Sequence, residues 1–261
     1  MLEAFDKALG DFEKRAFSAL HQYTFDWGSR DFQIQIRAQS LASDLGYFAM
    51  VLRDMHVIAI NHVSEDMDRE NVEHKKFLEN YVATNPGAVL DEKFWVSAPT
   101  ARARPILIPA KFGATFKAFF FFVRAYQDGL YRLVKLLCGM ELKRDEDDSM
   151  KSAINEATRE FVRGNLVADA LKATCPDYPA WFIDMRDLRN RTKDGIGVSY
   201  SSGKNFTTGE TTVGIRFRRP KSDESPVVSL DTASAALSMS TRATDSIIKV
   251  GRGNGKLTSK G

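Results

Sequence analysis

The chain has 261 residues, 43% of them hydrophobic, which is enough to bury a sizeable core in one large domain, or in one domain with an appendage. Its formal net charge is +3, and its two cysteines, Cys138 and Cys175, exclude a disulfide framework and a cysteine-rich zinc site. No secretory signal stands out, and charged side chains interrupt the most apolar run, 110–140, so we expect a soluble cytoplasmic protein that makes no membrane contact.

The charge is distributed unevenly along the chain. From Arg186 to the end there are 14 Lys and Arg against 7 Asp and Glu, a net charge of +7. The first 185 residues hold 23 basic and 27 acidic residues, a net charge of −4. A basic C-terminal third suggests a polyanionic partner, although a solvated surface with a basic tail explains the same asymmetry.

Helical periodicity dominates the N-terminal half. Apolar residues recur at helical spacing over 1–22, and a second, longer stripe predicts a helix that runs to about Val63. A separate, more polar helix is expected over about 65–82. Four prolines between 85 and 110 predict an irregular connection there, with "PILIP" as an extended crossing segment.

The segment 116–137 has the widest apolar stripe and is predicted to be the central core helix. The stripe contains Phe116, Phe119, Phe120, Val123, Leu130, Val134 and Leu137. Beyond the acidic run 145–148, which is expected to be a solvated cap region, one helix is predicted over about 148–173. Pro179, at a favoured first-turn position, begins another helix that ends near Lys193.

After Gly195 the pattern changes from helical to alternating. Two Thr-, Val- and Ile-rich runs predict a β-hairpin over about 195–219, followed by a last helix over about 230–249. We therefore expect a mainly α fold, a helical bundle with a small C-terminal β-hairpin and a final helix, in a single domain of residues 1–250. The Gly-, Lys- and Ser-rich residues 251–261 are predicted to be a disordered basic tail.

The stretch "RDLRNRTKDG", 186–195, concentrates positive charge at a helix end. Arg186, Asn190 and Lys193 fall on one ladder at i, i+4 and i+7, with Arg189 at the border of the apolar stripe. Trp181 is expected on the core side of this helix, and Phe182 on the adjoining side. Such a ladder of donors can bind an anion, or it can simply complement the negative end of the helix dipole.

These residues resemble the signature motif of the HEPN-like superfamily, in which an Arg-Asn pair is followed by three residues, a His and often a Gly. Arg189 and Asn190 match the pair and Gly195 matches the Gly, but Asp194 stands where the His is expected. A second similarity lies in the central helix, where paired aromatics precede Arg124 and Asp128. At i, i+4 these two can form an ion pair, which could equally be structural. The resemblance covers roughly residues 30–250.

The resemblance implies a metal-independent ribonuclease that acts as a homodimer. In such an enzyme the His serves as acid and base, and the Arg binds the scissile phosphate. The resemblance implies no cofactor and no metal. Asp194 departs from this pattern, because an ordinary Asp has a pKa of about 3.9 and cannot donate a proton at neutral pH. The four histidines all lie N-terminal to the motif, and His56 is the one that could approach the central helix.

Three functions remain open. The first is a non-catalytic HEPN-like protein that binds RNA, another phosphate-bearing ligand or a partner protein through Arg186, Arg189 and Lys193, with Arg124 and Asp128 in support. The second is a divergent endoribonuclease in which Arg189, Asn190 and Asp194 carry the chemistry, or Asp128 replaces Asp194. The third is a structural or regulatory helical bundle without a nucleic-acid role.

Overall fold

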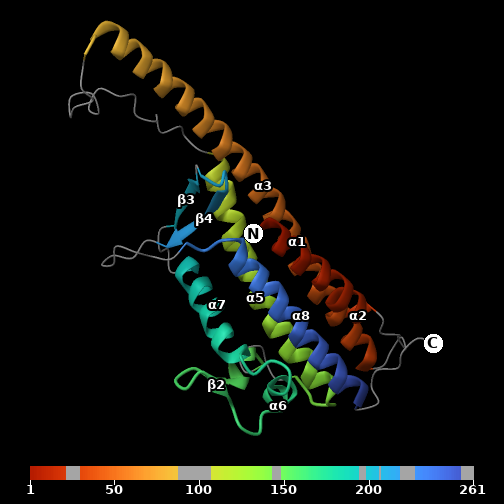
Figure 1. The fold of residues 1–261 in the computed structure, drawn as a ribbon. Helices are drawn as coiled ribbons and strands as arrows, with labels where there is room; N and C mark the ends of the chain where they lie inside the picture. Colours follow the sequence, from red (N-terminus) through yellow and green to blue (C-terminus); the bar gives the residue numbers. More distant parts are fainter. Residues whose placement is uncertain are drawn as a thin grey trace.

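The computed structural model describes residues 1–21, 30–87, 107–142, 148–193, 198–205, 207–217 and 227–253, and helices form most of these segments (Figure 1). The N-terminal helix is confirmed. It consists of α1 (Leu2–Asp11), the π-helical η1 (Phe12–Phe17) and α2 (Ser18–His21). Its buried side, which includes Phe5, Leu9 and Phe12, packs mainly on α8 (Leu230–Gly253).

The two helices predicted over 30–63 and 65–82 are one helix, α3 (Arg30–Thr84), of 55 residues. No Gly or Pro separates the two predicted segments, so nothing interrupts the backbone hydrogen bonds there. Ser64, at the expected break, lies inside the helix, and its hydroxyl is 3.2 Å from that of Thr211. The end of α3 extends well beyond the rest of the bundle (Figure 1).

The central core helix is confirmed as α5 (Leu107–Leu137), and all seven residues of its predicted stripe are buried. The helix begins nine residues earlier than expected. Pro109 lies in its first turn, where a missing N–H costs no helical hydrogen bond, so the end of "PILIP" is helical and not extended. Residues 88–106 lie outside the described segments. Helices α3, α7 and α8 all pack on α5.

The prediction of a single helix over 148–173 is wrong. The segment contains η2 (Met150–Ala153), β1 (Ile154–Asn155), β2 (Glu160–Phe161) and α6 (Leu166–Lys172). The side chain of Asn155 accepts the N–H groups of Ala157 and Thr158 and turns the chain between the strands. Arg159 and Gly164 have φ values of +56° and +72°, which no helix continues through.

The C-terminal elements agree with the prediction. They are α7 (Tyr178–Lys193), β3 (Val198–Lys204), β4 (Thr211–Phe217) and α8. The hairpin is antiparallel, with Val198 opposite Phe217, and packs on α3 and α5. Helix α8 extends to Gly253, so the first three residues of the predicted tail are helical, and 254–261 lie outside the described segments.

Buried residues from α1 through α8 form one hydrophobic core, which the structure builds around α5. The fold is therefore mainly α, as the sequence predicts, with two small antiparallel sheets, of which the sequence predicts the C-terminal one, β3–β4. Within the described segments, no helix is both long and apolar enough to cross a membrane.

Candidate anion-binding site

Helix α7 presents one buried line of side chains to α5. Tyr178, Phe182 and Met185 are buried on this line, and Arg189 follows at the next helical interval. Phe182 is thus in the core and not on the adjoining side of the helix as expected. Trp181 is only partly buried. Because Arg189 continues the buried line, its guanidinium is directed against α5, although the residue as a whole is only partly buried.

The start of α7 is held by α8, which fixes the rotation of α7 about its axis. Both terminal nitrogens of Arg242 donate to the carboxylate of Asp177, at 2.9 and 3.0 Å, and one of them also donates to the carbonyl of Thr174, at 2.9 Å. This bidentate pair lowers the pKa of Asp177. The same face of α7 is thereby kept towards α5.

The ion pair predicted on α5 is present. A guanidinium nitrogen of Arg124 lies 3.0 Å from the carboxylate of Asp128, which also accepts the backbone N–H of Met150 at 2.9 Å. The guanidinium carbon of Arg124 is 4.7 Å from the ring centre of Phe182 on α7. Its Nη1 is buried without a hydrogen-bond partner among the described residues.

Arg189 lies over α5 one turn N-terminal to that pair. Its guanidinium carbon is 5.3 Å from the ring centre of Phe121, and its Nη1 donates to the side chain of Asn190 at 3.3 Å. Its Nε is a second buried guanidinium nitrogen without a partner within the described segments. Asn190 of the predicted motif therefore orients Arg189 and leaves part of its hydrogen-bonding capacity unused.

Arg186 has a partner that the sequence did not indicate. Its guanidinium forms an ion pair with Glu156, in the turn between β1 and β2, and Lys151 lies 3.4 Å from the same carboxylate. The hydrogen bond from Arg186 lowers the pKa of Glu156. Glu156 was missed because its segment was predicted to be helical, and only the turn-forming Asn155 before it could have indicated otherwise.

Arg124, Arg186 and Arg189, here named the arginine cluster, lie close enough to influence one another. Burial is the main cause that lowers the pKa of Arg124, and repulsion from the other two arginines adds to it, against the attraction of Asp128. Burial likewise raises the pKa of Asp128 in spite of its arginine neighbours. Three guanidinium groups thus face two carboxylates, with unused N–H donors, which is an arrangement suited to an anion.

The structure gives less information about the other residues that the sequence singled out. Lys193 is exposed at the end of α7, while Asp194 and Gly195 lie outside the described segments. His56 does approach α5, with its ring centre 6.0 Å from that of Phe112, but it is far along the helix from Arg124. Within the described ranges, no group of three His, Cys, Asp or Glu is arranged to hold a metal ion.

The features that bear on function are therefore the arginine cluster, its two carboxylates and the exposed Phe121 beside Arg189. Comparisons of the chain with protein-family models, with curated proteins and with solved structures each found no match.

Proposed function

We propose that the protein is a non-catalytic, HEPN-like helical protein that binds RNA phosphates through the arginine cluster, with Lys193 at its edge. The observation that carries this proposal is the pair of buried guanidinium nitrogens, Nη1 of Arg124 and Nε of Arg189, that have no partner among the described residues. An unsatisfied buried N–H of a cation is costly, and an incoming phosphate oxygen would satisfy it.

RNA is favoured over a small phosphate ester by the surroundings of the cluster. Phe121 is 40% exposed beside Arg189 and offers an aromatic surface on which an unpaired base can stack. The basic C-terminal third supplies further positive charge for a polyanion. The resemblance of the Arg-Asn motif to the HEPN-like superfamily points to the same class of ligand.

Binding without cleavage is favoured by the carboxylates. Asp128 is already engaged by Arg124 and by the N–H of Met150, so it supports the arginines and is not poised as a general base. Asp194 occupies the position of the family's His, and a carboxylate there repels a phosphate.

The test is the affinity of the purified protein for a labelled single-stranded RNA. We expect Arg189→Met to weaken binding by about tenfold to a hundredfold, because a charge-assisted hydrogen bond to phosphate contributes about 1.5–3 kcal/mol. The slope of log K against log salt concentration should become shallower by about 0.7, the value for one single-stranded phosphate contact. Fluorescence anisotropy over a salt series measures both quantities.

The matched control is Arg15→Met, which removes the same charge from the opposite side of the bundle, where Arg15 pairs with Asp245 of α8. Equal effects of the two variants would reduce the proposal to unspecific electrostatics. Arg189-dependent shortening of the RNA would instead establish the ribonuclease function. Asp194→His, which restores the family residue, extends the assay, since cleavage gained by that variant would identify an intact nuclease scaffold.

A second prediction concerns Glu156, which neutralises Arg186 in the free protein. We expect Glu156→Gln to strengthen RNA binding roughly twofold to fivefold. In the natural protein an incoming phosphate must first break the ion pair between Arg186 and Glu156, and an exposed ion pair contributes about 0.2–1 kcal/mol. The control is Glu160→Gln in the same hairpin, an exposed residue that loses the same charge. Equal gains in both variants would mean that net charge alone controls binding.

We also propose that two copies of the chain associate, as the HEPN-like resemblance implies, so that two arginine clusters lie at one interface. Light scattering on the eluting protein measures this directly. A clean monomer at RNA-binding concentrations would contradict the composite site, while the affinity test of the single cluster would stand unaffected. A partner protein in place of RNA would leave the anisotropy unchanged in every variant.

A further inference from the structure

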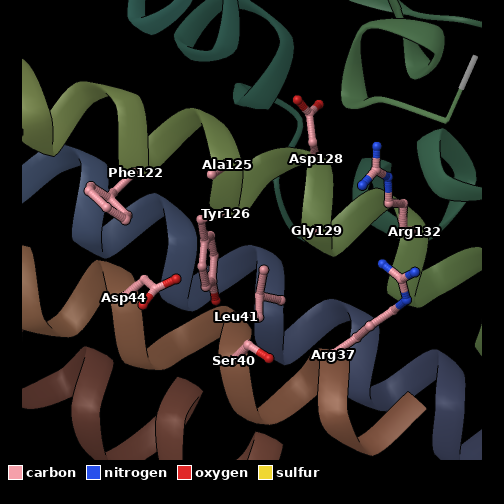
Figure 2. Close-up of a pocket in the computed structure, with 10 residues that line it drawn as sticks. All are labelled: Arg37, Ser40, Leu41, Asp44, Phe122, Ala125, Tyr126, Asp128, Gly129 and Arg132. Atoms are coloured by element: carbon pink, nitrogen blue, oxygen red, sulfur yellow. The ribbon is translucent and has the colours of Figure 1, made fainter. Parts of the chain in front are cut away.

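A cavity of about 380 Å³ lies between α3 and α5, on the side of α5 away from α7 (Figure 2). Its α5 wall includes the small residues Ala125 and Gly129, one helical turn apart. A Cβ on Gly129 would lie 2.2 Å from Cδ1 of Leu41, so α3 approaches the backbone of α5 closely at this point. The volume is within the range of small-molecule sites, roughly 300–1,000 Å³.

The ends of the cavity have opposite character. Figure 2 shows the guanidinium groups of Arg37 and Arg132 at one end, and Asp44 with the ring of Phe122 at the other. Arg37 and Asp44 are exposed, and neither forms an ion pair with another residue of the described segments. The direction of Arg132 is fixed in part by its Nε, which donates to the carbonyl of Asp148 at 3.1 Å.

Apolar side chains line the middle of the cavity and its Asp44 end. Leu41 lies against Gly129, and the ring of Phe122 is stacked on that of Phe48, with centres 3.8 Å apart. Tyr126 forms the buried floor, and its hydroxyl is hydrogen-bonded to Thr244 of α8. A ligand that matches this order needs an anionic end, a flat apolar centre and hydrogen-bond donors at the far end.

We propose that this cavity binds a mononucleotide, with its phosphate between Arg37 and Arg132 and its base beside Phe122. The carboxylate of Asp44 then accepts N–H groups from the edge of the base. A guanine presents two adjacent donors to a carboxylate and therefore fits best. A fatty acid or a dicarboxylate has no donor for Asp44, and inorganic phosphate occupies only one end.

The cavity is distinct from the arginine cluster, although Asp128 lies on its wall between the two sites. Asp128 is held by Arg124 and Met150, so its charge is compensated on the α7 side. The nucleotide can be free, or it can be one nucleotide of a bound RNA strand. The proposal does not require that RNA binds at the arginine cluster.

The experiment is calorimetric titration of the full chain with guanosine monophosphate, guanosine, inorganic phosphate and free lysine. We expect guanosine monophosphate to bind at or below about 1 mM. Arg37→Met should weaken it by about tenfold or more, through loss of a charge-assisted hydrogen bond. Asp44→Asn should weaken guanosine monophosphate but not phosphate. Arg15→Met should leave the affinity unchanged.

Several results would overturn this assignment. The first is that guanosine monophosphate does not bind at about 1 mM. The second is that Arg37→Met and Asp44→Asn both bind it with unchanged affinity. The others are that inorganic phosphate binds as tightly as guanosine monophosphate, or that lysine binds in a way that depends on Asp44.

The source of the nucleotide follows from the RNA assay. If Arg37→Met weakens RNA and mononucleotide alike, the cavity takes a nucleotide of the strand; if only the mononucleotide is weakened, it takes a free one. Thermal melting confirms that the variants fold.

Discussion

Lys135→Met is expected to destabilise the protein by about 3–5 kcal/mol, the usual cost of leaving one partner of a buried ion pair uncompensated. Lys135 on α5 and Asp148 form such a pair, with side chains 8% and 1% exposed. Removal of the ammonium group takes the positive charge of Lys135 away from a carboxylate that is 1% exposed. Urea unfolding followed by circular dichroism measures the loss.

The control for this variant is Lys111→Met, the same substitution at an exposed position of the same helix. Its effect should stay within about 0.5 kcal/mol. The double variant Lys135→Met, Asp148→Leu removes both charges and should recover most of the stability. A loss in Lys135→Met no larger than in Lys111→Met would show that the pair is hydrated.

The Lys135–Asp148 pair also bears on the arginine cluster. Asp148 precedes Met150, whose N–H is bound by Asp128, and Glu156, which pairs with Arg186. We therefore expect Lys135→Met to weaken the hydrogen-exchange protection of the Met150 amide before global unfolding. The chain from 148 to 156 thus supplies both groups that position the arginines from outside α5 and α7.

The second large effect is a pH dependence that originates from His56. This side chain is fully buried, both ring nitrogens lack hydrogen-bond partners among the described residues, and burial lowers its pKa from 6.5 to about 4. The amino group of Met1 lowers the pKa further, while Asp231 opposes this. The folded state therefore keeps His56 neutral at a pH where the unfolded chain is protonated.

The consequence for stability follows from proton linkage. Above pH 6.5 neither state binds the proton and no stability is lost, whereas between pH 6.5 and 4 the unfolded chain is stabilised by protonation. We expect His56 alone to account for roughly 3 kcal/mol of lost unfolding free energy by pH 4, at about 1.36 kcal/mol for each pKa unit. Urea unfolding at a series of pH values measures it.

His56→Leu is the matched variant, because it keeps an apolar side chain of similar size in the core. It should be at least as stable as the natural protein near neutral pH, since two unsatisfied buried nitrogens are removed. The difference between the two pH profiles isolates His56 from the carboxylates. Superimposable slopes between pH 6.5 and 4 would mean that His56 is protonated without cost in the folded state.

The arginine cluster could be predicted in part. The i, i+4 spacing of Arg124 and Asp128 is a local relation, and their ion pair is present as expected. The spacing of Arg186 and Arg189 placed both on α7, but the rotation of the helix was misjudged at Phe182, which is buried. A stripe that ends in arginines has no sharp apolar boundary, so only the packing on α5 and the Arg242–Asp177 contact decide its orientation.

The sequence by itself determined the N-terminal helix, α5 with its buried stripe, α7, α8 and the β3–β4 hairpin, because each depends on residues a few positions apart whose periodicity is visible in the chain. Only the tertiary structure decided that Glu156 neutralises Arg186 and that Arg37 and Arg132 lie at the same end of a cavity. These relations join residues 30 to 95 positions apart. Such contacts are stabilised by burial and by charge interactions between side chains of different helices and strands. The periodicity of apolar residues within one segment does not predict them.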